Sequence, residues 1–235
     1  REPKRRKNIT TANNGTQTSG EIGLVAFVCC HPRTLSAHFI GISILALVIY
    51  GNMMWIPAFL GRTYGISISE IGTTYGFITA SCGAIGLLIG GFSADWLFAR
   101  GRSDAHLLTV LLSALLCWPL FVMMPLMPTA GWAFAALVPM TIVSTIHGGI
   151  AGAALQLMTP NHLRARIITL YFLVANIIGV GLGPTLIALL SDYVLRDEAM
   201  LRYAMAGISA VLLPVSALII TTGLKSFRAA VQAQD

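Results

Sequence analysis

Charged residues are scarce in this chain, and acidic ones are the scarcest. Only 10% of its 235 residues are charged, with 9 Asp and Glu against 15 Lys and Arg. Soluble globular domains carry about 25% charged residues, so the composition excludes an ordinary water-soluble domain. The formal net charge is +6. The bases lie in short segments between apolar runs rather than on one polar face, which argues against nucleic-acid binding.

Cysteines and catalytic motifs are also sparse. The four cysteines are Cys29, Cys30, Cys82 and Cys117. None has metal-ligand spacing with a histidine, so we expect no metal site and interpret the cysteines as small apolar residues. The apolar runs contain no Ser/His/Asp set, His-Glu-x-x-His motif or paired carboxylates. The sequence therefore predicts no catalytic residues, no cofactor and no enzymatic activity.

Long apolar runs dominate what is present. Apolar residues make up 56% of the chain, and a helix needs about 20 of them to cross a hydrocarbon core about 30 Å thick. The period-2 alternation of a membrane barrel is absent, so we predict an all-α membrane protein. Six transmembrane helices are expected at residues 37–60, 71–98, 105–124, 131–158, 164–190 and 201–224.

The remaining segments flank this six-helix bundle of residues 37–224. We interpret residues 1–20 as a cytoplasmic linker, 21–36 as a short interfacial helix with a turn, and 225–235 as a cytoplasmic tail. The chain begins with Arg1 rather than Met, and its polybasic, polar opening is typical of an internal loop. We therefore expect another segment to precede it.

The bases are distributed unequally between the two ends of the spans. With six spans both termini share one side, and 12 of the 15 Lys and Arg fall there, leaving only Arg62, Arg196 and Arg202 on the other. Loops rich in Lys and Arg stay in the cytoplasm, so both termini are expected to be cytoplasmic.

Several local signals mark helix ends and helix contacts. Ser67 with Glu70 forms a capping box before the second span. Thr159 followed by Pro160 predicts a cap before the fifth. The pairs Gly86/Gly90 and Gly148/Gly152 have the four-residue spacing that lets membrane helices approach closely.

An acid and two arginines stand at the end of the second span. Residues 91–102 contain Gly91, Asp95, Arg100 and Arg102. This stretch resembles the loop signature of the major facilitator superfamily, G-x-x-x-D-R-x-G-R-R. It departs from that signature because Trp96 replaces the usual basic residue and because Arg-Gly-Arg lies two residues further on.

Other stretches carry the same resemblance over essentially the whole chain. Residues 1–6 look like the basic start of the family's central loop, 158–166 like the loop before its eleventh span, and 176–184 with 190–193 are similar to spinster-like members.

The resemblance implies the C-terminal half of a major facilitator fold, with the N-terminal half as partner and membrane lipid around it. It implies secondary active transport of a small organic or amphiphilic solute by alternating access, with proton or ion coupling left open. The expected location is the bacterial inner membrane. The alternative is a self-contained six-span protein, acting as a homodimeric half-transporter or a channel.

The motif suggests a cytoplasmic latch. A carboxylate near a helix N-terminus is stabilised by the helix dipole, and in the family fold the terminus near Asp95 is that of the fifth span, around residues 159–164. Arg100 or Arg102 would pair with Asp95, which we take as the only acid at a span's cytoplasmic end. The alternative is a charge cluster that merely sets topology.

Polar residues at mid-span are candidates for a substrate cavity, because sites in such folds lie near the bilayer midplane. They are Asn52, Tyr75, Thr79, His147 and Asn176. His147 is the one ionisable side chain that we place well inside a span. Each of them contacts solute or simply bridges helices, and bridging bonds are common in membrane bundles.

Overall fold

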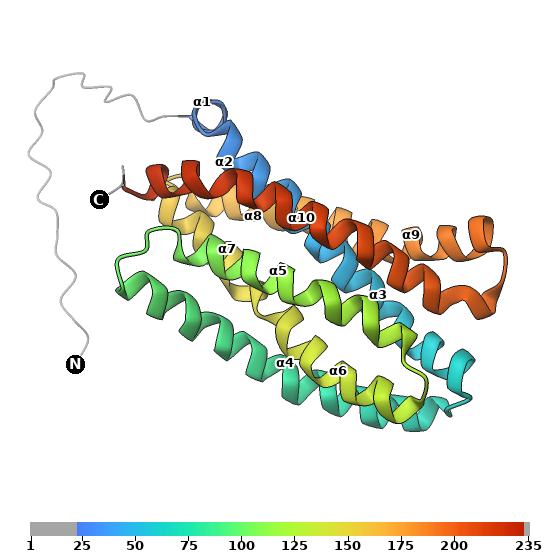
Figure 1. Ribbon diagram of the computed structural model, residues 1–235. Coiled ribbons are helices and arrows are strands. Elements are labelled where there is room, and N and C mark those ends of the chain that lie inside the picture. The colour runs from blue at the N-terminus through green and yellow to red at the C-terminus, as the bar shows by residue number, and fades with distance from the viewer. Residues whose placement is uncertain (1–22, 233–235) are drawn as a thin grey trace, which may run out of the picture.

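Helices make up all the regular structure of the described chain. The computed structural model describes residues 23–232, apart from the side chain of Glu198. All regular elements in this range are helical, which confirms the predicted fold class (Figure 1). Six helical segments are long and apolar enough to cross a membrane: Pro32–Tyr64, Ile68–Ala99, Ala105–Leu126, Ala130–Met158, Arg164–Leu195 and Leu201–Gln232. The predicted linker at 1–20 lies outside the described residues.

Several spans consist of more than one element. In chain order the elements are α1 (Leu24–Cys30), α2 (Pro32–Ser36), η1 (Ala37–Gly41), α3 (Ile42–Tyr64), α4 (Ile68–Ala99), α5 (Ala105–Met123), η2 (Met124–Leu126), α6 (Ala130–Thr145), α7 (His147–Met158), α8 (Arg164–Asn176), η3 (Ile177–Leu182), α9 (Gly183–Leu189), η4 (Leu190–Leu195), η5 (Glu198–Met200) and α10 (Leu201–Gln232). The segments η1, η3 and η4 are π-helical, and η2 and η5 are 3₁₀ turns.

The last helix is longer than expected. The sequence predicts a tail from residue 225, whereas α10 continues to Gln232. The added turns keep Phe227, Ala230 and Val231 buried. These residues have the i, i+3, i+4 spacing of one helix face, so the end of α10 packs on the bundle instead of leaving it.

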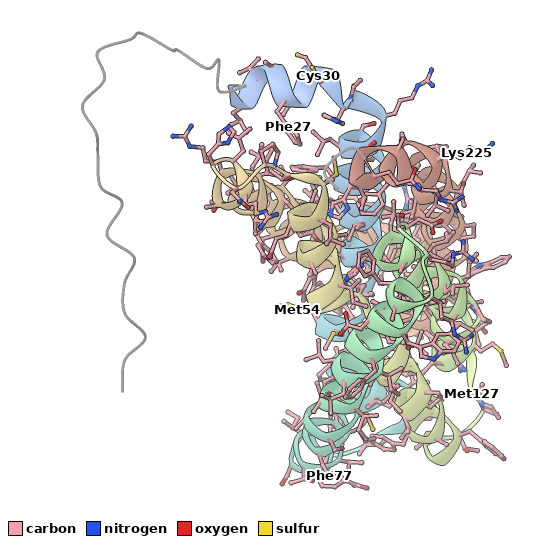
Figure 2. The ribbon with its side chains drawn as sticks, turned by 90° about the vertical axis from the view of Figure 1, so that its left-hand side faces the viewer. Phe27, Cys30, Met54, Phe77, Met127 and Lys225 are labelled. Carbon is pink, nitrogen blue, oxygen red and sulfur yellow. The ribbon has the colours of Figure 1, made fainter. Side chains whose placement is uncertain are left out.

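The first span also begins earlier than expected, because Pro32 starts a helix that runs without a break into the membrane. Only α1 remains of the predicted interfacial segment, and Figure 2 shows it lying across the end of the bundle. Within the span, Ala37–Gly41 is a π-helical turn. The hydroxyl of Ser216 on α10 donates to the Gly41 carbonyl at 2.7 Å, so this disturbed backbone is satisfied by a neighbouring helix, as hydrocarbon requires.

The two predicted N-terminal caps have opposite outcomes. At α4 the Ser67 hydroxyl accepts a hydrogen bond from the Glu70 amide, which confirms the Ser67 cap. The cap predicted at Thr159–Pro160 is wrong, since α8 begins at Arg164 with Leu163 as its N-cap residue. The guanidinium Nε of Arg164 instead donates back to the Thr159 carbonyl at 3.0 Å, which holds residues 160–163 as a turn.

Glycines set two of the closest helix contacts. A Cβ at Gly86 of α4 would collide with the Ile142 carbonyl and the Thr145 hydroxyl of α6. A Cβ at Gly183 of α9 would lie 3.0 Å from the Gly51 amide nitrogen of α3. Since lipid supplies no hydrophobic force between helices, such close backbone approach provides the packing contact that holds them together.

The bundle leaves some helices far more open than others. Figure 1 shows α4 with α6 along one side, and α8 and α9 near α3 and α10 on the opposite side. In their most apolar stretches, the first span is 61% buried, whereas the second and fifth are only 28% and 22% buried. Helix α4 and the fifth span therefore present long, uncovered apolar faces.

The Gly86 contact generates a test. We expect Gly86→Ala to lower the melting temperature of the purified chain, because overpacking of this kind costs about 1–3 kcal/mol. Gly76→Ala on the same helix is the matched control, since nothing lies within 4 Å of its added Cβ, and alanine favours helix by about 1 kcal/mol. Thermal unfolding in detergent measures both. Equal melting temperatures would mean that α4 and α6 do not depend on this close approach.

Candidate functional site

Seven of the ten described bases gather at one end of the bundle, which we call the arginine-rich rim. The rim holds α1, the C-terminal end of α10, the turn between α4 and α5, and the N-terminus of α8 (Figure 1). Its described bases are Arg33, Arg100, Arg102, Arg164, Arg166, Lys225 and Arg228. The α4–α5 turn passes through Gly101 at φ +84°, a backbone conformation that glycine adopts without steric cost.

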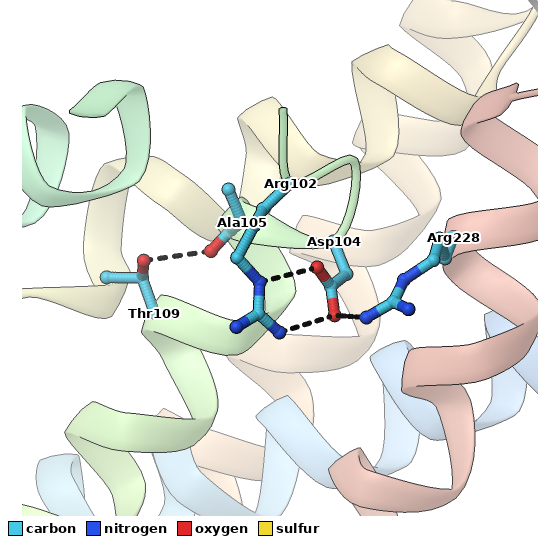
Figure 3. Close-up of polar contacts among 5 residues, drawn as sticks. All are labelled: Arg102, Asp104, Ala105, Thr109 and Arg228. Atoms are coloured by element: carbon cyan, nitrogen blue, oxygen red, sulfur yellow. Dashed lines mark hydrogen bonds and ion pairs between the residues drawn. The ribbon is translucent and has the colours of Figure 1, made fainter. Parts of the chain in front are cut away.

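A buried carboxylate organises this rim. Asp104, directly before α5, accepts hydrogen bonds from Arg102 Nε at 3.2 Å and Arg102 Nη2 at 3.3 Å (Figure 3). Its second oxygen also accepts from Arg228 Nη2 at 2.7 Å. The Asp104 side chain is only 2% exposed, whereas both arginines are about half exposed. The α4–α5 turn is thereby fastened to the last helix, 124 residues later in the chain.

The two arginines keep Asp104 ionised. Burial alone would raise the pKa of this carboxyl, but the hydrogen bonds and positive charges of Arg102 and Arg228 outweigh it and hold the pKa below the usual value of 3.8. In the first turn of α5, which follows Asp104, the Thr109 hydroxyl donates to the Ala105 carbonyl at 2.8 Å and supports the turn locally (Figure 3). Sequence reasoning missed Asp104, although its place between Arg102 and an apolar run was a usable signal.

Asp95 has a different environment. Its side chain is exposed and lines a small pocket of about 120 Å³. Gly91 and Ala94 of α4, His106 of α5 and Gly149 of α7 contribute to the same pocket. The Asp95 carboxylate is close enough to act electrostatically on His106, whose Nδ1 has no hydrogen-bond partner among the described residues.

The arginines expected to pair with Asp95 are engaged elsewhere in this conformation. Arg102 binds Asp104, and the Arg100 guanidinium lies 3.6 Å from the centroid of the Trp96 ring. The pocket around Asp95 contains no residue of α8, the helix whose N-terminus was expected to face it. The structure thus places Gly91 and Asp95 on one pocket, and it pairs Asp95 with neither Arg100 nor Arg102.

Asn52 does not face a cavity here, contrary to its prediction as a cavity residue. It is fully buried, and its Nδ2 donates to the Ser209 hydroxyl on α10 at 3.1 Å and to the Val48 carbonyl at 2.8 Å. Its neighbour on the same helix, Trp55, donates from Nε1 to the Pro184 carbonyl at 2.9 Å. Both side chains therefore join α3 to other helices, because a buried amide or indole N–H needs a partner in hydrocarbon.

The other polar candidates lie on the open helices. Tyr75 of α4 is half-buried and donates to the Met53 carbonyl at 3.1 Å, while Thr79 donates to the Tyr75 carbonyl at 2.8 Å. Asn176, the last residue of α8, is exposed and donates to the Phe172 carbonyl at 2.7 Å. These bonds leave carbonyl and hydroxyl oxygens able to accept from a bound solute.

His147 marks a break in the fourth span. Helix α6 ends at Thr145 and α7 begins at His147, whose Nδ1 donates to the Ser144 carbonyl at 2.6 Å. Its side chain is buried, at 9% exposed. A second intramembrane histidine was missed: His38 in η1 is fully buried and lies edge-on to Tyr171, with ring centroids 5.1 Å apart. The predicted span begins only one residue before His38, so no sequence signal indicates that this histidine lies well inside a span.

The Asp104 ion pairs predict a pH-dependent stability. We expect Asp104→Asn to lower the free energy of unfolding by about 1–2 kcal/mol at neutral pH. This loss lies between those typical of exposed and of buried ion pairs. Because the folded pKa is depressed, the wild-type advantage is complete above the unfolded pKa near 3.8 and disappears as the pH falls through the lower folded value. Melting temperatures between pH 7 and pH 3 measure this. The control is Asp192→Asn, at an exposed acid of η4; an equal loss in that variant would contradict the prediction.

Sequence comparison finds a relative among transport proteins. An MFS-type efflux pump of Mycolicibacterium smegmatis (strain ATCC 700084 / mc(2)155) is 30% identical over 157 residues, which cover 67% of this chain and 36% of the pump. The chain therefore spans about a third of the length of this curated relative. No protein-family model matches the chain.

Structural comparison finds the same fold in solved transporters. A bacterial homolog of the human lysosomal transporter Spinster, crystallised inward-facing and unoccupied, matches with a TM-score of 0.62 at 19% identity, over 94% of this chain and 52% of its own. The inward-facing, occupied form matches with a TM-score of 0.60 at 19% identity. This match covers 85% of the present chain and 49% of the homolog. The sequence similarity and the shared fold agree with the motif in residues 91–102, and the chain belongs to the major facilitator superfamily.

Proposed function

We propose that the chain is the C-terminal six-helix half of a twelve-span secondary transporter. The observation that carries this proposal is the match of nearly the whole chain to about half of a spinster homolog. The uncovered apolar faces of α4 and of the fifth span support it, because a second six-helix unit would bury most of this surface. The solute is proposed to be small and organic or amphiphilic, moved by alternating access, with coupling to a proton or ion left open.

Orientation and location are part of the same proposal. All seven described bases of the rim lie at the end where α10 finishes, and loops rich in Lys and Arg stay in the cytoplasm. We therefore place the arginine-rich rim and both termini in the cytoplasm, with the bundle in a bacterial inner membrane. The relative from Mycolicibacterium smegmatis, named as an efflux pump, supports transport across such a membrane.

Solute contact is proposed for Tyr75, Thr79, His147 and Asn176. Tyr75 and Thr79 lie on α4, and Asn176 lies on α8, the two least buried spans. Substrate sites in such folds lie between the two repeats near mid-membrane, so these polar groups would face the space that the second half encloses. Asn52 is left out of this set because it is buried and its Nδ2 already donates to the Ser209 hydroxyl.

The half-transporter proposal can be tested by reassembly. We expect cells that produce this chain together with a matching N-terminal six-helix half to expel ethidium, a small amphiphilic probe, and cells with either half alone to show at least tenfold slower efflux. The measurement is the loss of ethidium fluorescence from preloaded cells. Ethidium movement through liposomes that contain only this chain as a dimer would favour the homodimeric alternative instead.

The cytoplasmic gate is proposed to include Gly91, Asp95, Arg100 and Arg102. We infer that Asp95 latches the rim in the outward-open state, where Arg100 or Arg102 leaves its present partner and approaches it. Trp96 and Asp104 hold these arginines in the conformation described here. Asp95, which has no ion pair among the described residues, would gain one as the bundle rocks.

The latch predicts an accessibility change at a natural thiol. Cys82 is nearly buried and follows Tyr75 and Thr79 along α4. In a chain with Cys29, Cys30 and Cys117 changed to Ser and paired with its N-terminal half, we expect Asp95→Asn to raise alkylation of Cys82 by a cytoplasmic impermeant maleimide several-fold. The reason is that loss of the latch favours the inward-open state. Asp192→Asn serves as the control, and an unchanged rate in Asp95→Asn would exclude the latch.

A further inference from the structure

An apolar groove opens beside the first span at the arginine-rich rim. Its volume is about 370 Å³, within the range of about 300–1,000 Å³ typical of small-molecule sites. It lies between α1, α2 and η1 on one wall and α8 on the other. Its apolar lining comprises Val28, Pro32, Leu35, Phe39, Ile40 and Leu170.

The groove offers water nothing to bind. Ser36 is its one polar lining residue, and the Ser36 hydroxyl already donates to the Arg33 carbonyl at 3.2 Å. A cavity without free polar groups does not retain ordered water. The groove lies at the rim end of helices long and apolar enough to cross a membrane, so the hydrocarbon of lipid chains can reach it from the surrounding leaflet.

Helix α1 shapes the groove at its rim end. Figure 2 shows α1 running across the end of the bundle, with Phe27 pointing toward the other helices and Cys30 pointing away. Phe27 is 1% exposed and anchors α1, whereas Val28 is exposed and contributes to the groove. The anchored helix thus forms a wall that a flexible loop would not maintain.

Positive charge stands at the mouth of the groove. Arg166 precedes Leu170 by four residues on α8 and so lies on the same face, one turn nearer the rim. Its side chain is exposed and makes no ion pair within the described part of the chain. Arg33, next in sequence to the lining residue Pro32, and Arg164, two residues before Arg166, are also exposed. The elements α1, α2, η1 and α8 contain no acidic residue. The mouth is therefore complementary to an anion.

We propose that the groove binds an anionic phospholipid of the surrounding leaflet, with one acyl chain between η1 and α8 and the headgroup phosphate at Arg166. Basic sites at the membrane ends of helices recognise such headgroups, and the apolar lining excludes a free phosphate as the whole ligand. The site is separate from the proposed solute contacts, since none of those residues lines the groove. Failure of the transport proposal would therefore leave it standing.

The test is native mass spectrometry of the full chain in detergent with added phosphatidylglycerol. We expect one retained lipid on the wild type and about fivefold weaker binding of phosphatidylglycerol by Arg166→Gln, the usual contribution of one base near a membrane surface. Leu170→Trp should fill the groove and remove the retained lipid. Phosphatidylcholine, which has no net charge, should bind the wild type at least fivefold more weakly than phosphatidylglycerol.

Matched variants separate this site from general lipid coating. Lys225→Gln removes an exposed base of α10, and Leu173→Trp changes another exposed leucine of α8; neither residue lines the groove. Both should bind phosphatidylglycerol as the wild type does. Equal losses in Leu170→Trp and Leu173→Trp, or equal binding of the two lipids, would overturn the proposal. A shift from dimer to monomer in Leu170→Trp without lipid loss would assign the groove to a second copy of the chain.

Discussion

In hydrocarbon, every backbone polar group must find its partner within the protein, and this bundle is arranged around that constraint. Its helices approach through glycine, as at Gly86 and Gly183, so that backbone meets backbone. Where a helix is irregular, a neighbour supplies the missing bond, as Ser216 does for Gly41. At η1 the departure from regular α-helix thus lies where another helix is close enough to compensate.

The same need for a partner applies to the buried charge at the arginine-rich rim. Asp104 is buried because two half-exposed arginines converge on it, and these arginines keep their remaining hydrogen-bonding groups in water. Asp95, only nine residues earlier, is exposed and has no ion pair within 4.0 Å among the described residues. One acid therefore holds elements together, while the other lies exposed without an ion pair among the described residues.

Much of the fold could be predicted from sequence because apolar length and helix signals are local. Six spans and the Ser67 cap follow from residues that are neighbours in the chain. The end of α10 was mispredicted because the burial of Phe227 depends on helices distant in sequence. The candidate site was harder for the same reason: the Asp104–Arg228 contact and the burial of Asn52 against Ser209 join residues more than 120 positions apart. No local pattern encodes such pairs.

The place of Arg228 in the chain has a consequence for biosynthesis. A ribosome makes Asp104 long before it makes the last turns of α10, so the growing chain holds this acid with Arg102 alone until Arg228 has emerged. The second arginine arrives only when the final span has inserted and its end has folded back onto the bundle. Synthesis of the last turns of α10 therefore closes the charged end, and a product truncated before residue 228 would keep a half-satisfied acid under the membrane surface.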